Sequence, residues 1–200
     1  MADTERQTGL DDLATGSEAH LVLARQSVDG AHAYCRDHLA SSDHPESAPI
    51  VVLTDGDPGE STLGSDVRGR RGVVVAMGDD LRGGAAGADG PSSDDAWPAT
   101  IFVSDDLGEV GRTVDGYLTA WASSGYRPTV CVDSLTGLVR RSSIHGAYRF
   151  LYVLRRRIDD VGGDLHVHGD PSDQEEEILR TFFSVFDRVV SFDDGGSPLP

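Results

Sequence analysis

An aspartate closes the apolar stretch TVCVD (129–133), and the polar residues of SLTG (134–137) follow it. A carboxylate at the carboxyl end of a buried parallel strand can hold the magnesium ion of a bound nucleotide, because ligands bind at that edge of a sheet. Asp133 and Ser134 are therefore candidate nucleotide-edge residues. The alternative is structural, since many buried strands end in Asp where the chain enters a turn.

A second candidate site lies in HVHGD (166–170). His166 and His168 project from the same face of a strand, because side chains alternate along it. With the Asp170 carboxylate they form a ligand set suited to zinc or iron in a metal-dependent hydrolase. A complete site needs further ligands, and the candidates are His32, His145 and Asp133. The alternative is that the histidines hydrogen-bond to Asp133 or to loops, while Asp170 shapes a turn.

A phosphate-binding loop is expected after the first apolar run, HLVLA (20–24), and its pattern is Gly-x-x-x-x-Gly-Lys-Ser/Thr. Only Gly30 fits this spacing, because Arg25 stands at the first Gly and Ala31 at the Lys. All 17 basic residues are Arg, so no Lys elsewhere can substitute. Gly30, Asp133 and Ser134 are therefore at most the remnants of a nucleotide-binding edge of the sheet. We expect no cofactor beyond weak binding of ATP with Mg²⁺.

Short runs rich in Val and Ile indicate strands at 20–24, 50–54, 72–77, 100–104, 129–133, 164–168 and 188–192. Most are continuous rather than alternating, which is typical of strands covered on both faces. Apolar residues at helical spacing predict helices over 105–122 and 147–161, and Gly162 and Gly163 stop the second. A Ser-x-x-Glu capping box at 172–175 begins a third helix. This alternation predicts an α/β fold with three layers and a mainly parallel central sheet.

The length of 200 residues suffices for one core, and we expect a single domain over 19–192. Residues 1–18 and 193–200 are polar and are predicted to be disordered ends. The segment 79–98 is rich in Gly, Ser and Asp and has no apolar period. It is predicted to be a flexible loop insertion, and the alternative is a binding lid.

The chain is strongly acidic, with 34 Asp and Glu residues and a formal net charge of −17. Such a field repels phosphate backbones and argues against nucleic-acid binding. Abundant Asp, no Lys and few aromatics are typical of proteins adapted to molar salt. The triple Arg at 155–157 lies mid-helix and is expected to pair with nearby acids, the alternative being an anion site.

No apolar run approaches the roughly 20 residues needed to cross a bilayer, and the N-terminal stretch lacks a signal-peptide pattern. We therefore expect a soluble cytoplasmic protein that does not bind membranes. Cys35 and Cys131 fall in a predicted helix and strand, which predicts two reduced core thiols rather than a disulfide.

The motifs after about residue 100 resemble the RecA superfamily, specifically its KaiC-like branch. The run DSLT (133–136), a Phe-Leu pair (150–151), a His-x-His-x-Asp-Pro strand end (166–171) and Phe-Asp (186–187) follow one another in this order. Haloarchaeal proteins of unknown function with a degenerate domain of this kind look most similar. The resemblance implies a RecA-like, P-loop-type fold over about 20–192 without the usual phosphate binding (Walker A) motif. Active relatives place a water-activating glutamate after the second strand, where this chain has Thr54, Asp55 and Gly56.

These features favour a non-catalytic regulatory or protein-interaction module that binds a protein partner or forms a homo-oligomer. The carboxyl edge of the sheet is the expected contact surface, with six residues gathered there: Gly30, Asp133, Ser134, His166, His168 and Asp170. The alternative function is an enzyme, either an atypical NTPase or a metal-dependent hydrolase using the His166, His168 and Asp170 set. A third possibility is a hetero-oligomer in which the partner donates the missing Lys or Arg.

Overall fold

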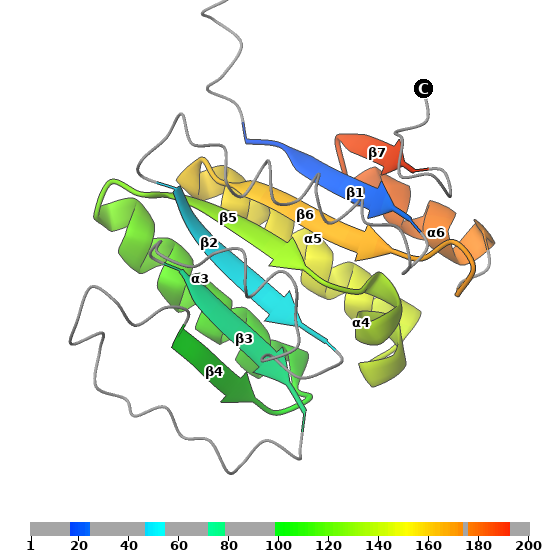
Figure 1. The fold of residues 1–200 in the computed structure, drawn as a ribbon, viewed down its shortest axis with the longest axis horizontal. Coiled ribbons are helices and arrows are strands. Elements are labelled where there is room, and N and C mark those ends of the chain that lie inside the picture. The colour runs from blue at the N-terminus through cyan, green and yellow to red at the C-terminus, as the bar shows by residue number, and fades with distance from the viewer. Residues whose placement is uncertain (1–16, 25–46, 55–71, 79–98, 174–175, 193–200) are drawn as a thin grey trace, which may run out of the picture.

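One seven-stranded sheet organises the molecule, with the strand order β4-β3-β2-β5-β6-β1-β7 and parallel pairing throughout (Figure 1). The computed structural model describes residues 17–24, 47–54, 72–78, 99–173 and 176–192. The strands are β1 (Ala19–Leu23), β2 (Ser47–Leu53), β3 (Val73–Met77), β4 (Ala99–Val103), β5 (Arg127–Val132), β6 (Asp164–Gly169) and β7 (Arg188–Ser191). The predicted parallel sheet is confirmed.

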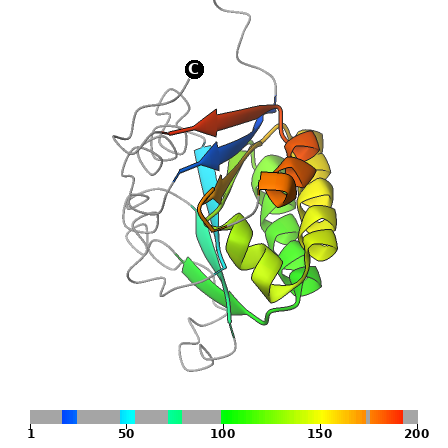
Figure 2. The same cartoon turned by 90° about the vertical axis from the view of Figure 1, so that its right-hand side faces the viewer.

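The described helices cover one face of this sheet (Figure 2). They are α3 (Leu107–Ser123), α4 (Leu135–Arg141), α5 (Ile144–Val161), α6 (Glu176–Phe182) and the 3₁₀ turn η1 (Phe183–Val185). The predicted helices over 105–122 and 147–161 correspond to α3 and α5. The capping box lies partly outside the described residues, because 174–175 are not among them. No helix in the described ranges is long and apolar enough to cross a membrane.

The opposite face of the sheet is also shielded from solvent. Val51, Leu53, Val74, Ala76 and Cys131 form a buried cluster there, separate from the main core under the helices. Burial on both faces is the reason for the continuous apolar runs in these strands. Cys131 is a buried, reduced thiol, as predicted.

The passage from α5 into β6 depends on two glycines. Gly162 caps α5 in the left-handed conformation with φ 68°, where glycine carries no steric penalty. Gly163 approaches the neighbouring strand so closely that a Cβ atom built on it would lie 2.4 Å from the backbone oxygen of Pro128. The predicted stop signal is confirmed, and the second glycine also fixes where β6 begins.

Carboxylates tie the elements together at the amino end of the sheet. Asp164 accepts hydrogen bonds from both Nε and Nη2 of Arg127, at 3.1 and 3.0 Å, which joins β6 to β5. Asp187 accepts from Arg155 Nη1 at 2.5 Å and from the Ala19 amide at 2.8 Å. Partial burial raises the pKa of Asp187, but these two donors outweigh that effect and hold it below its usual value.

The triple Arg pairs with acids, as the sequence predicts. Arg155 binds Asp159 at 2.9 Å in addition to Asp187, and Arg157 binds Asp115 at 2.6 Å and Asp160 at 3.3 Å. These are contacts along α5 and to its neighbours, so two of the three guanidinium groups stabilise the fold instead of forming an anion site.

The two residues just before β1 are bound to the start of β6. Ser17 Oγ donates to the Gly163 carbonyl at 2.5 Å, and the Glu18 amide donates to Asp164 at 3.1 Å. Several predictions concern residues outside the described ranges, among them those for the end segments 1–16 and 193–200, the 79–98 insertion and Cys35.

Candidate functional site

Asp133 forms short hydrogen bonds with the end of the neighbouring strand β2. Its Oδ1 atom accepts hydrogen bonds from both the amide and the hydroxyl of Thr54, each at 2.8 Å. The Asp133 amide in turn donates to the Val52 carbonyl at 3.0 Å. Thr54 is completely buried, so both of its donors depend on partners within the protein. Asp133 thus continues the pairing of β5 with β2 beyond the last residue of each strand.

Arg141, the last residue of α4, extends this contact across the sheet edge. Its Nε group donates to the Thr54 carbonyl, and its Nη1 group forms an ion pair with Asp105, which follows β4. We call Asp133, Thr54, Arg141 and Asp105 the edge network. The network joins the carboxyl ends of β5, β2 and β4 through one guanidinium group and two carboxylates.

Ser134 acts as the N-cap of α4. Its Oγ atom accepts a hydrogen bond from the Gly137 amide at 3.0 Å, and its backbone is extended as N-cap residues usually are. This short helix was not predicted, because its seven residues give too little periodicity to recognise. Ser134 therefore helps to begin the helix that carries Arg141.

The histidines of β6 lie on the sheet face opposite the helices. His166 stacks on His20 of β1, with ring centroids 5.2 Å apart and an interplanar angle of 8°. His166 is paired in register with Cys131 on its other side. It lies in the middle of β6, so the prediction that it reaches the carboxyl edge is wrong. The error arises because the edge begins after Gly169, three residues further along.

His168 lies nearer to the edge network and contacts Cys131. Burial lowers the pKa of His168, but the Cys131 sulfur, through its charge and a hydrogen bond, and the Asp133 carboxylate outweigh this effect. The pKa is therefore raised above the ordinary value of 6.5. One imidazole, one thiol and one carboxylate thus interact at the carboxyl half of β5 and β6.

The raised pKa of His168 predicts a pH-dependent stability. Because the folded-state pKa exceeds the unfolded one, its contribution is fully present below about pH 6.5 and is lost as the pH rises through the folded-state pKa. We expect the free energy of unfolding to fall over that interval, and His168→Gln to remove most of the slope. Chemical denaturation at a series of pH values measures this dependence.

His145→Gln is the control, because it changes an exposed histidine at the start of α5, and it should leave the slope unchanged. Equal slopes in the His168 variant and the parent would contradict the assignment.

Asp170 shapes the turn after β6. Its Oδ1 atom accepts from the amide and the hydroxyl of Ser172, at 2.8 and 2.5 Å. Within the part of the chain that the structure describes, no three His, Cys, Asp or Glu side chains form a group that could hold a metal ion. The metal set predicted from His166, His168 and Asp170 therefore has no support from these residues. Gly30, the remaining candidate of the nucleotide edge, and His32, a candidate further ligand, lie outside the described ranges.

Sequence reasoning missed two members of the edge network, Arg141 and Asp105. Thr54 was noted only as a missing glutamate, whereas its buried amide and hydroxyl are the donors that bind Asp133. A pairing between residues 79 positions apart leaves no local pattern in one sequence. The one sequence feature that could have indicated Arg141 is its position about two helical turns after Asp133.

The parallel sheet, its strand order and the position of Asp133 define the chain as an α/β protein with a RecA-like fold. A family model, Family of unknown function (DUF7504), matches residues 18–192, and the chain belongs to that family. No curated protein sequence matches it.

Two solved archaeal structures are similar to this fold. A KaiC-like protein from Pyrococcus horikoshii has a TM-score of 0.52 at 10% identity, covering 90% of this chain and 73% of that one. The flagellar accessory protein FlaH from Methanocaldococcus jannaschii has a TM-score of 0.51 at 12% identity, covering 90% and 74%. These similarities confirm the RecA/KaiC-like fold.

Proposed function

We propose that this chain is a non-catalytic RecA/KaiC-like module that binds a partner protein, in an organism with molar intracellular salt. The observation that carries the proposal is the pairing of Asp133 Oδ1 with both donors of Thr54. Asp133 is the residue placed to hold magnesium, and Thr54 stands where active relatives place their glutamate. In this chain the two residues bind each other. The hydrogen bonds at this carboxyl edge hold β5 and β2 together.

The composition supports the same proposal. No Lys occurs in the sequence, and the net charge of −17 opposes the approach of a triphosphate. Arg141 is the cation of the edge network, and its guanidinium group binds the Thr54 carbonyl and Asp105. Weak binding of Mg-ATP without hydrolysis is compatible with this arrangement, and a partner that donates a cation is not required.

Steady-state hydrolysis of Mg-ATP in molar KCl tests the absence of catalysis. We expect the purified chain and its Asp133→Asn variant to release phosphate at the same rate, equal to that of a mock purification. Asparagine keeps an oxygen for the Thr54 donors but removes the charge that magnesium requires. Phosphate release by the parent above the mock rate, abolished in Asp133→Asn, would overturn the proposal.

A further inference from the structure

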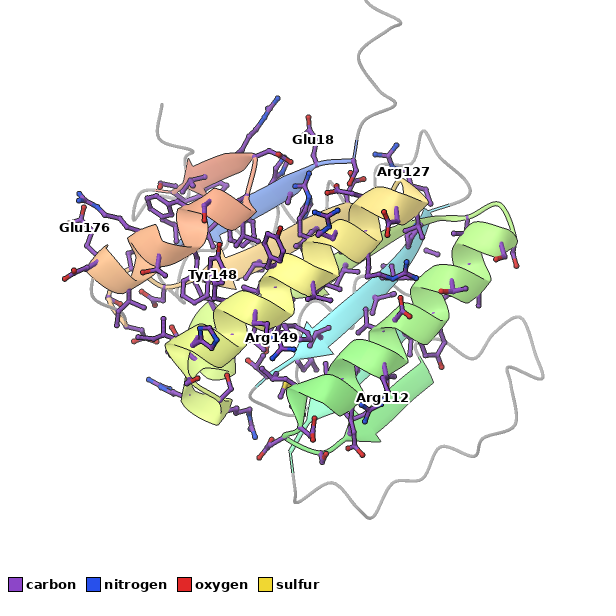
Figure 3. All side chains as sticks on the ribbon, turned by 180° about the vertical axis from the view of Figure 1, so that it is seen from behind. Glu18, Arg112, Arg127, Tyr148, Arg149 and Glu176 are labelled. Carbon is purple, nitrogen blue, oxygen red and sulfur yellow. The ribbon has the colours of Figure 1, made fainter. Side chains whose placement is uncertain are left out.

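A cavity of about 680 Å³ lies between α3 and α5, on the side of the molecule that carries the helices (Figure 3). Its apolar lining consists of Leu107, Leu118, Phe150, Val153 and Leu154. At one end it reaches Asp105 and Asp106, which follow β4 at the carboxyl edge. The volume lies within the range of about 300–1,000 Å³ that is usual for ligand pockets. We call this cavity the α3–α5 groove.

Glycines keep the groove open. Gly108, Gly111 and Gly146 line it, and none places a side chain between the two helices. A Cβ atom added to Gly111 would lie 3.7 Å from the Phe150 ring, at ordinary contact distance, so the space above that ring can accept a side chain. An apolar group from another molecule can therefore rest on Phe150 without displacing the helices.

The acids that line the groove already have partners. Asp105 pairs with Arg141, and Asp115 pairs with Arg157 at 2.6 Å. Asp106 caps α3 and accepts from the amides of Gly108 and Glu109, at 2.6 and 3.2 Å. Their negative charge is offset within the protein, by guanidinium groups or by the amides of a helix N-terminus.

Two arginines of the groove differ from these acids. Arg112 of α3 and Arg149 of α5 are exposed, and Figure 3 labels both side chains. Within the described part of the chain, neither forms an ion pair or a hydrogen bond. Guanidinium groups bind carboxylates with two parallel hydrogen bonds. In a chain with net charge −17, two exposed arginines beside an apolar cavity favour an anionic occupant with an apolar group.

We propose that the α3–α5 groove binds an acidic peptide segment of a partner protein, with one bulky apolar side chain on Phe150 and carboxylates on Arg112 and Arg149. This proposal rests on the partner-binding function proposed above. Val153, which lines the groove, is exposed by 53% and offers further apolar surface to an extended segment. A second copy of the chain would bring a further net charge of −17, which the first copy repels. A short peptide with a few acidic residues therefore fits the groove better than a second copy.

The test uses an array of acidic octapeptides whose central position is varied through the apolar side chains, followed by fluorescence anisotropy with the full chain. We expect binding that requires the apolar side chain. The double variant Arg112→Gln/Arg149→Gln should weaken it at least about tenfold, as loss of a charge-assisted hydrogen bond predicts. Arg180→Gln/Arg188→Gln removes the same charge from α6 and β7, outside the groove, and should leave the affinity unchanged.

A second pair of variants tests the cavity itself. Gly111→Leu fills the groove and should abolish binding. Gly116→Leu places the same side chain on α3 where nothing lies within 4 Å, and it should bind as the parent does. Thermal unfolding checks that both variants are folded.

Three results would overturn the peptide assignment. They are the absence of any binding peptide, equal weakening by the two arginine pairs, and a dimer in sedimentation that Gly111→Leu dissociates, which would make a second copy the occupant. None of these depends on hydrolysis. Asp133-dependent release of phosphate would instead overturn the proposed function and leave the peptide result as measured.

Discussion

Asp133→Ala lowers the free energy of unfolding by about 2 kcal/mol, because it leaves the buried amide of Thr54 without its acceptor. The Thr54 hydroxyl then keeps only the Ser134 carbonyl, 3.4 Å away. Asp133→Asn costs about 1 kcal/mol or less, since its side-chain oxygen can still accept from both donors. Equilibrium denaturation in molar KCl measures both values. The ratio of the two losses is the informative quantity, because it separates the acceptor role of Asp133 from its charge.

Asp173→Ala is the matched control for this comparison. Asp173 is an exposed acid in the turn before α6, and its removal should change stability by no more than about 0.5 kcal/mol. If Asp133→Ala proved as mild as Asp173→Ala, the hydrogen bonds to Thr54 would not contribute to stability, and the edge network would lose its structural role.

Gly163→Ala is the second substitution with a large expected effect, a loss of about 3 kcal/mol from the free energy of unfolding. The new Cβ atom would lie 2.4 Å from the Pro128 carbonyl oxygen, which is backbone and cannot turn aside. Either α5 or the start of β6 must shift, and β6 carries His166 and His168. Thermal and chemical denaturation, supported by circular dichroism, measure the loss.

Gly116→Ala controls for the change of residue type. It meets no atom within 4 Å in the middle of α3, so it should raise stability by about 0.5–1 kcal/mol through helix propensity. Stabilisation by Gly163→Ala as well would show that β6 and β5 can separate slightly without cost, contrary to the close approach described above.

The fold could be predicted because its signals are local. Continuous Val and Ile runs gave the strands, and the stripes from Val110 to Trp121 and from Ala147 to Ile158 gave α3 and α5. The Gly162 stop is also local, because it depends on the φ angle of one residue. Such patterns arise whenever one face or stripe must be buried.

The site was predicted only in part, because its interactions are long-range. Asp133 was placed correctly at a strand end, but its partner Thr54 lies 79 residues earlier. The stacking of His166 on His20 depends on β6 lying beside β1, which a single sequence does not reveal. The α3–α5 groove depends on which helices are neighbours and on the glycines between them, so no motif indicated it.

The central claim is that Asp133 serves the fold and not a magnesium ion. The change in the free energy of unfolding on adding saturating Mg-ATP, compared between the parent and Asp133→Asn, tests it most directly. We expect the same change for both proteins, zero or small, because any weak nucleotide contact does not depend on the Asp133 charge. A magnesium-dependent stabilisation of the parent that is lost in Asp133→Asn would contradict it.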